Sequence, residues 1–293
     1  MSCLLCEAEA ARSVPYPGAQ SPAARQLELS KIAICATCGF GRASPCPDQA
    51  TLDRFYGSGS YWHGSTNSYQ LAHERVQAGM RVQRCRALLP PQAGLRVLDV
   101  GAGHGFIAEA LEGLGRVSAY DFVEPDDSAA RYIEQSSRAF PCRRVSVPSS
   151  AGGQYDVLFL NHVLEHVADP EIFLRGLLRQ LRPGALAYVE TPLADQRFKL
   201  DVFPHVLFFT LGAMRALGDR LGVETLAVEA FGRMYRESGR QLGRKLAAAA
   251  FQLAVRSRMR SLQTLIDRAI WSYRVQPDGV WLRWMFRPGS PRE

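Results

Sequence analysis

Three glycines at alternate positions, Gly101, Gly103 and Gly105, are the residues whose spacing says most about chemistry. They follow an apolar run that contains one acid, Asp99, and a helical pattern begins at Phe106. This pattern predicts a parallel strand, a tight turn and a helix N-terminus, an arrangement that brings backbone N–H groups up to a ligand. A Cβ atom at the glycine positions would block both the turn and the close approach of the ligand.

The neighbouring residues distinguish between kinds of ligand. A dinucleotide-binding fingerprint needs a third glycine at the position that Phe106 occupies, so a hydride-transferring enzyme is disfavoured. Glu124 ends a second predicted strand, nineteen residues after Gly105, where an acid can accept hydrogen bonds from a ribose diol. Asp121, earlier in the same predicted strand, is the rival acid for this contact.

Four sequence blocks follow one another in order: VLDVGAGHG, VEPD, YDVLFLNHVLEHVADP and LRPGALAYVETP. Together they resemble the class I S-adenosylmethionine-dependent methyltransferases, over roughly residues 93–230. The resemblance implies an α/β, Rossmann-like sheet of seven strands in the order 3-2-1-4-5-7-6, with strand seven antiparallel, and S-adenosyl-L-methionine (SAM) as cofactor. The cofactor contacts that it implies are Asp99, Gly101, Ala102, Gly103, Gly105, Glu124, Asn161 and His162.

Histidines gather after the buried strand predicted over 156–160, where the sequence reads NHVLEH. In an open α/β sheet the ligand lies outside the carboxyl ends of the strands, so His162 and His166 are candidates for contact with the methyl acceptor. Histidine can act as a general base near neutral pH. The segment DVFPHVLFFT resembles a family segment whose histidine, here His205, often faces the pocket. Each of these three histidines can instead be a packing residue.

Two Cys-x-x-Cys pairs, Cys3 with Cys6 and Cys35 with Cys38, are separated by 28 residues. Four thiolates on two tight turns match tetrahedral Zn²⁺ and leave no open position, which is typical of a structural site. The N-terminus resembles that of small zinc-knuckle methyltransferases of bacterial sugar and natural-product pathways. A redox pair or accidental spacing are the alternatives, and Cys46 is not assigned as a ligand.

The segments before and after the glycine turn (48–89 and 145–150) carry weaker sequence signals. The aromatic, Gly- and Ser-rich stretch 48–69 predicts either a flexible lid, whose Tyr56, Tyr61 and Trp62 cover a ligand, or a loop packed on the core. A helix is expected over 70–89, with its arginines on the face opposite its apolar residues. After a strand expected near 145–147, related enzymes often place an acid against the adenine, but Val147–Ser150 offers only hydroxyl and backbone groups.

Positive charge is concentrated at the C-terminal end, because residues 231–293 contain thirteen Arg and Lys against four acids. Residues 240–271 read as an amphipathic, arginine-rich helical insert before a last strand expected over 280–287. Such an insert can be a membrane-surface element, a phosphate or nucleic-acid site, or a lid or dimer face. We expect it to cap the acceptor side of the pocket and to supply charge for an anionic acceptor.

Length and composition agree with one large α/β unit plus additions. The sequence has no run of about 18 apolar residues and no signal-peptide pattern, and its seven cysteines favour a reducing, cytoplasmic setting. The expected organisation is a zinc-knuckle module (1–47), an aromatic lid and helix (48–92), a methyltransferase core (93–232), a basic helical insert (233–277), and a last core strand with its tail (278–293).

Three functions remain open from the sequence. The first is methyl transfer from SAM to a small acceptor, such as a sugar, a nucleotide-linked sugar or a secondary metabolite. The second is methylation of an RNA base, which the basic tail favours, although NHVLEH replaces an NPPY-like base-clamping motif after strand four. The third is a non-catalytic binding protein that retains the fold, which the intact glycines and Glu124 argue against.

Overall fold

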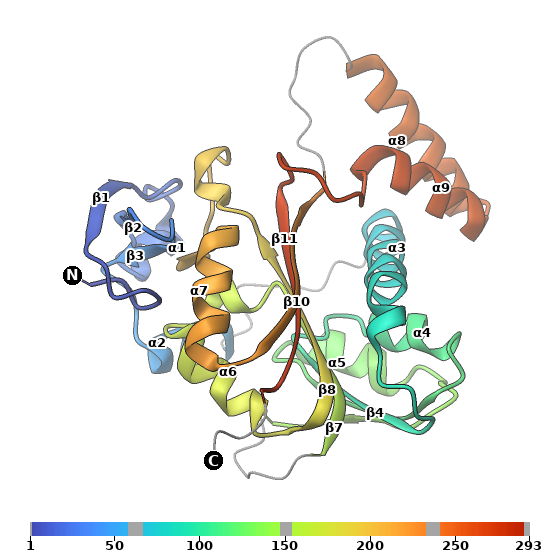
Figure 1. The fold of residues 1–293 in the computed structure, drawn as a ribbon. Helices are drawn as coiled ribbons and strands as arrows, with labels where there is room; N and C mark the ends of the chain where they lie inside the picture. Colours follow the sequence, from blue (N-terminus) through green and yellow to red (C-terminus); the bar gives the residue numbers. More distant parts are fainter. Residues whose placement is uncertain (1, 58–66, 147–153, 233–240, 290–293) are drawn as a thin grey trace.

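The chain is built around a seven-stranded sheet with the order β10-β11-β8-β7-β4-β5-β6 (Figure 1). A computed structural model describes residues 2–57, 67–146, 154–232 and 241–289. The strands are β4 (Leu95–Val100), β5 (Val117–Val123), β6 (Cys142–Arg144), β7 (Tyr155–Asn161), β8 (Leu181–Pro192), β10 (Glu224–Phe231) and β11 (Trp281–Arg287). β4 pairs in parallel with β5 and β7, whereas β11 is antiparallel to β8 and β10. The predicted order 3-2-1-4-5-7-6, with strand seven antiparallel, is therefore confirmed.

Helices cover both faces of this sheet, which is why its central strands are continuous apolar runs. On one side lie α3 (Ser68–Cys85), α4 (Phe106–Glu112) and α5 (Asp127–Glu134), and on the other α6 (Pro170–Leu178) and α7 (Leu211–Leu221) (Figure 1). Asp126 caps α5 by accepting a hydrogen bond from the backbone N–H of Ala129. Short 3₁₀ turns occupy Arg86–Leu88, Leu164–His166 and Asp195–Arg197.

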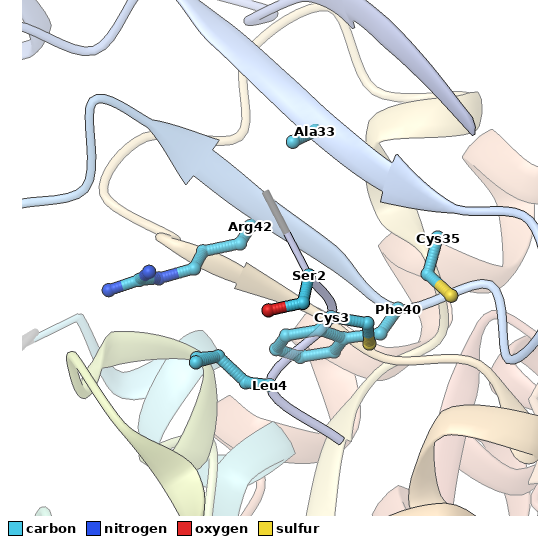
Figure 2. Close-up of a pocket in the computed structure, with 7 residues that line it drawn as sticks. All are labelled: Ser2, Cys3, Leu4, Ala33, Cys35, Phe40 and Arg42. Atoms are coloured by element: carbon cyan, nitrogen blue, oxygen red, sulfur yellow. The ribbon is translucent and has the colours of Figure 1, made fainter. Parts of the chain in front are cut away.

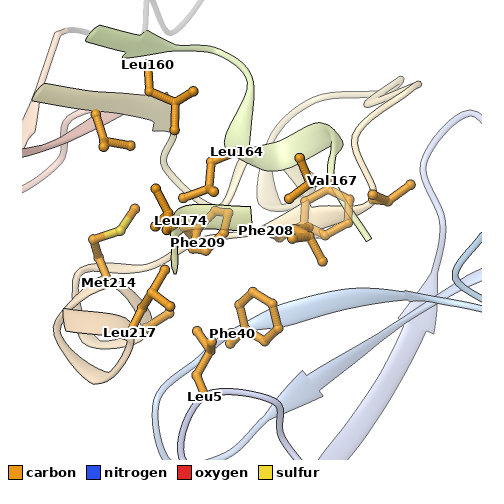
Figure 3. Packing of buried hydrophobic residues seen from close by; sticks show 14 of the residues in the cluster. Leu5, Phe40, Leu160, Leu164, Val167, Leu174, Phe208, Phe209, Met214 and Leu217 are labelled. Carbon is orange, nitrogen blue, oxygen red and sulfur yellow. The ribbon is translucent and has the colours of Figure 1, made fainter. Parts of the chain in front are cut away.

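A second, four-stranded sheet contains the N-terminal cysteine segments. Its order is β1-β2-β3-β9, with β1 (Ala10–Pro15), β2 (Lys31–Cys35), β3 (Gly41–Ser44) and β9 (Leu207–Phe208), and α1 (Pro22–Gln26) connects β1 to β2. β9 comes from the region after β8, so a core segment completes the N-terminal sheet. Figure 3 shows Leu5 and Phe40 of this part beside Phe208 and Leu217, within one continuous hydrophobic cluster. The N-terminal segment therefore shares a core with the large sheet.

The basic insert folds as a helical hairpin outside α3, made of α8 (Gln241–Arg256) and α9 (Arg260–Trp271) (Figure 1). Residues Ser257–Met259 separate the two helices, and Arg258 there has a left-handed φ of 55°. Tyr69 of α3 stacks edge-on against Phe251 of α8, with ring centroids 4.9 Å apart. The helical stretch expected over 240–271 is thus two helices, because the chain reverses at 257–259.

Two local expectations need correction. The strand expected near 145–147 lies three residues earlier, because Tyr120 of β5 pairs with Cys142. The first part of the predicted lid is a helix, α2 (Gln49–Gly57), which buries Leu52 and Phe55 and so favours the packed alternative. The remaining expectations for these segments concerned the lid residues Tyr61 and Trp62 and the stretch Val147–Ser150, which offers no acid for the adenine. These residues lie outside the described part of the chain.

Candidate active site

The glycine turn after β4 is shaped by close packing. Gly101 has a φ of +74°, and a Cβ atom there would lie 2.3 Å from Cγ2 of Val163. Gly105 has a φ of +70°, and its Cβ atom would lie 2.7 Å from Cγ1 of Ile133. Any other residue at either position would combine an unfavourable backbone conformation with a clash. The turn that leads into α4 therefore requires glycine at both positions, because Val163 and Ile133 pack directly against its backbone.

Glu124 lies at the carboxyl end of β5 and faces this turn. Its Oε2 accepts a hydrogen bond from the Gly103 N–H (2.7 Å), and its Oε1 accepts one from the Asp126 N–H (2.9 Å). Burial raises the pKa of Glu124, although both backbone donors lower it. Asp121, the rival acid, instead pairs with Arg143 (2.8 Å) and accepts a hydrogen bond from the Tyr155 hydroxyl (2.8 Å). The geometry therefore favours Glu124 over Asp121 as the acid at the glycine turn.

Asp99, the acid within β4, is almost completely buried beneath the turn. The Tyr120 hydroxyl donates to its Oδ2, while its Oδ1 has no hydrogen-bond partner among the described residues. Burial raises the pKa of Asp99 to about 7, against the effect of the hydrogen bond from Tyr120. An orphaned carboxylate oxygen at the base of the turn can accept a donor from a bound ligand.

His162, directly after β7, has a left-handed φ of 54° and lies between two carboxylates. Its Nδ1 is 3.3 Å from Oε1 of Glu165, and its Nε2 is 3.3 Å from Oε1 of Glu190. Burial lowers the pKa of His162, but the two carboxylates more than offset this and raise it to about 9. An imidazole with that pKa is charged at neutral pH and already holds a proton, so His162 is the least suitable of the three histidines as a general base.

Glu190 in turn is held by an arginine of α3. Nε and one terminal nitrogen of Arg81 donate to Oε1 of Glu190 (3.1 and 2.6 Å), and the Tyr188 hydroxyl donates to Oε2 (2.9 Å). Burial would raise the pKa of Glu190, but Arg81 and His162 hold it below its usual range. Arg81 is mostly buried, although we expected the arginines of this helix on the face opposite its apolar residues.

His166 and His205 lie next to each other, with ring centroids 5.0 Å apart. Nδ1 of His205 is 3.0 Å from Oδ2 of Asp195, and the Tyr56 hydroxyl of α2 is 2.8 Å from Nδ1 of His166. Burial and the neighbouring His205 and His162 lower the pKa of His166 to about 4, against the opposing effect of Glu165. His166 is therefore neutral at pH 7.

The buried carboxylate Glu165 connects the three histidines. One ligand atom each from Glu165, His166 and His205 lie within 4.8 Å of one another, a combination that could also hold a metal ion. The structure thus brings the three predicted histidines together and adds Glu165, Glu190, Asp195 and Arg81, which the sequence reasoning missed. Glu165 follows the end of β7 and Glu190 lies near the carboxyl end of β8, so both could have been noticed there. Nothing in the local sequence singles out Arg81 or Asp195.

The four N-terminal cysteines converge on one point. Sγ of Cys3 lies 3.6 Å from Sγ of Cys38, Sγ of Cys6 lies 3.4 Å from Sγ of Cys35, and all four sulfurs lie within 4.8 Å of one another. Tetrahedral Zn²⁺ with Zn–S bonds of about 2.3 Å requires sulfurs about 3.8 Å apart, so the residues fit this metal. Figure 2 shows Cys3 and Cys35 beside Phe40 and Arg42, which line a small pocket next to this cluster.

This cysteine module also holds the segment that carries His205. The Tyr16 hydroxyl donates to the His205 carbonyl (2.9 Å), and the Ala43 N–H donates to the Val206 carbonyl (2.8 Å). The Thr210 hydroxyl donates to the Cys38 carbonyl (2.6 Å). The backbone of His205 is therefore fixed from the side of the cysteines, while its ring lies within ion-pair distance of Asp195.

The helical hairpin packs on α3 and contacts α4 through Arg260. Asp267 of α9 is buried, with Oδ1 2.5 Å from Nδ1 of His73 and Oδ2 accepting a hydrogen bond from Tyr273 (2.6 Å). Arg260 pairs with Glu109 of α4 (3.0 Å), beside the cofactor turn, and Arg258 is exposed. These placements do not bring Arg258 or Arg260 to the histidine cluster, where we expected an anionic acceptor to be held.

Comparisons with known proteins agree with this architecture. Residues 72–254, more than half of the chain, match the profile of a family described as a methyltransferase domain. A ubiquinone biosynthesis O-methyltransferase of Rhizobium rhizogenes is 32% identical over 157 residues, covering 49% of this chain and 63% of that protein. Its counterpart in Caulobacter vibrioides is 35% identical over 130 residues, covering 43% of this chain and 52% of that protein. The chain thus spans about six tenths or less of the length of these curated relatives.

Two solved structures share the fold at low sequence identity. One comes from the complex between the Haloferax volcanii Trm112 methyltransferase activator and a methyltransferase, with a TM-score of 0.54, 12% identity, and coverage of 84% of this chain and 100% of that chain. The other is the [4+2]-cyclase SpnF, with a TM-score of 0.50, 16% identity, and coverage of 83% and 97%. Because a protein named as a cyclase has this fold, the fold alone does not determine the reaction. By its family profile, its four sequence blocks and its sheet order, the chain belongs to the class I S-adenosylmethionine-dependent methyltransferases.

Proposed function

We propose that this chain transfers the methyl group of SAM to a hydroxyl group of a small-molecule acceptor, with His205 as the general base. The observation that carries the proposal is the pair of His205 and Asp195, at 3.0 Å, beside the neutral His166. An acid that holds Nδ1 of an imidazole leaves Nε2 to take a proton, the arrangement that orients many catalytic histidines. The relatives named as O-methyltransferases support oxygen as the acceptor atom.

The cofactor site that we propose is formed by the turn and the two neighbouring strand ends. Its residues are Asp99, Gly101, Ala102, Gly103, Gly105, Glu124, Asn161 and His162. Glu124 would accept hydrogen bonds from the ribose hydroxyls with the lone pairs that Gly103 and Asp126 leave available. Bound SAM supplies a methyl group that its sulfonium centre has already activated.

The chain's own contribution is then alignment and proton removal. His205 would accept the hydroxyl proton of the acceptor at Nε2 as the acceptor oxygen takes up the methyl group that bound SAM would supply. Asp195 stabilises the resulting imidazolium. His162, held between Glu165 and Glu190, contributes a fixed positive charge to the wall of the site, and His166 with Tyr56 supplies neutral hydrogen-bonding groups.

We further propose that the four cysteines bind one structural Zn²⁺, which would keep β9 and His205 in register with the large sheet. Methylation of an RNA base is the second function, supported only by the basic charge of the C-terminal segment. An assay with SAM labelled in the methyl group, offered simple catechols, sugars and total RNA as separate acceptors, tests these alternatives. Label in a small-molecule ether supports the proposal, and label in RNA alone overturns it.

A further inference from the structure

The outer surface of the helical hairpin has an unusual combination of side chains. Eight large hydrophobic side chains are exposed in the described part of the chain, and five of them lie on the hairpin or just after it. Each of these five is between 53% and 67% exposed: Leu246, Leu253, Met259, Leu265 and Val275. Leu246 and Leu253 are seven residues apart on α8, so they share one face of the helix. Ala249 and Ala250 lie between them and extend this apolar stripe.

This stripe faces away from the remainder of the molecule. Phe251 of α8 and Asp267 of α9 are the buried residues that contact α3. At 100° per residue, Leu246 and Leu253 lie opposite Phe251, and Leu265 lies well away from Asp267. The outward faces of both helices thus carry exposed apolar side chains that no described element covers.

Charge on the hairpin has one sign at its surface. Residues 241–275 contain seven Arg and Lys and a single acid, Asp267, which is buried against His73 and Tyr273. Arg256, Arg258 and Arg268 are exposed beside the leucines, and Arg260 is exposed while it contacts Glu109. A solvated helix normally mixes both signs on its exposed face, whereas an acid-free, leucine-bearing basic face is typical of helices that lie on anionic membranes.

We infer that the outward face of the α8–α9 hairpin docks onto an anionic lipid surface. Leu246, Leu253 and Leu265 enter the boundary between headgroups and acyl chains, and the arginines bind lipid phosphates. Charge complementarity favours this partner over a second copy of the chain, because two identical basic faces would repel each other. Exposed leucines favour it over nucleic acid, whose backbone offers nothing apolar for them to bury.

The test is co-sedimentation of the full chain with vesicles of phosphatidylcholine, with and without phosphatidylglycerol. We expect binding to the anionic vesicles that weakens as salt is added, because salt screens the arginines. Leu253→Glu together with Leu265→Glu should lower the partition coefficient by about tenfold or more. Arg256→Gln together with Arg258→Gln should lower it by roughly fivefold for each arginine on anionic vesicles only. None of these four residues belongs to the proposed active site.

The matched control is Ile172→Glu together with Leu200→Glu, which makes the same chemical change at exposed positions, 72% and 95%, away from the hairpin. This variant should bind vesicles as the unchanged chain does. The inference is overturned if the unchanged chain does not bind anionic vesicles, or if the hairpin and control variants lose binding equally. It is also overturned if the leucine variant converts a dimer into a monomer in light scattering, or if the arginine pair governs binding to single-stranded RNA but not to vesicles.

Discussion

Nδ1 of His205 lies 3.0 Å from Oδ2 of Asp195, although the two residues occupy different segments after β8. The same Asp195 oxygen is 2.8 Å from Nζ of Lys199, and burial of Asp195, which would raise its pKa, is outweighed by His205 and Lys199, which lower it. Asp195 is therefore ionised at neutral pH and can stabilise a positive charge that forms on the His205 ring. This pair is the basis of the proposed proton transfer.

Replacing His205 by Asn should separate catalysis from cofactor binding. Removal of a general base typically costs about 10²- to 10⁴-fold in rate. We expect His205→Asn to lower kcat in that range and to leave the dissociation constant of SAM, measured by calorimetry, unchanged. Asp195→Asn should lower kcat less and shift the pH profile of kcat. A His205→Asn enzyme with full kcat would assign the proton transfer to another group, with His166 the next candidate.

Glu124→Gln should weaken SAM binding. The carboxylate is held by the N–H groups of Gly103 and Asp126, and a hydrogen bond to a charged group contributes roughly 1.5–3 kcal/mol. The affinity for SAM measured by calorimetry should fall accordingly. Asp121→Asn is the matched control, because Asp121 pairs with Arg143 away from the turn. Unchanged affinity in Glu124→Gln with lost affinity in Asp121→Asn would identify the other acid as the ribose ligand.

The pair of carboxylates around His162 predicts a pH dependence of stability. The pKa of this histidine in the folded chain is raised from 6.5 to about 9, so its contribution is complete below pH 6.5 and is lost as the pH rises through about 9. The His162 side chain is 35% exposed, so water screens part of this effect. The melting temperature should fall between pH 7 and pH 9.5, and less in His162→Gln. Equal slopes in both proteins would mean that His162 is not charged.

Metal analysis of the purified chain should find one Zn²⁺. Cys35→Ser should lose it, whereas Cys46→Ser, at a cysteine outside the cluster, should retain it. Because Tyr16 and Ala43 hold the backbone of His205 and Val206, hydrogen exchange of residues 202–210 should speed up when the metal is lost. Absence of zinc with four freely reactive thiols would contradict the assignment. If the analysis finds a second metal ion per chain, and Glu165→Gln removes it, that ion is bound at the cluster of Glu165, His166 and His205.

The sheet could be predicted from sequence because its signals are local. The strand β5 (Val117–Val123), which was expected to end at Glu124, is encoded by a local run of mostly apolar residues. The glycine turn and Glu124 are likewise encoded within about thirty residues of chain. These features depend on neighbours in sequence, and this is why four short blocks were enough to identify the architecture.

The candidate site was less predictable because its contacts join distant segments. Arg81 lies on a helix whose arginines read as solvent-facing, and only the folded chain brings it to Glu190, 109 residues away. Tyr56 meets His166 across 110 residues, and Tyr16 meets His205 across 189. Contacts between residues so far apart leave no periodic pattern in the sequence. For the same reason, the sequence could not indicate that a core strand completes the sheet of the cysteine module.

Transfer of label from methyl-labelled SAM to a small-molecule hydroxyl is the measurement that tests the central claim most directly. The unchanged chain should produce a labelled methyl ether from a catechol or sugar acceptor and release S-adenosylhomocysteine in equal amount. Glu124→Gln should lose this activity through weaker SAM binding, and His205→Asn should lose it with SAM binding intact. A chain that binds SAM tightly but labels only RNA, or labels no acceptor in the small-molecule set or in RNA, would contradict the account.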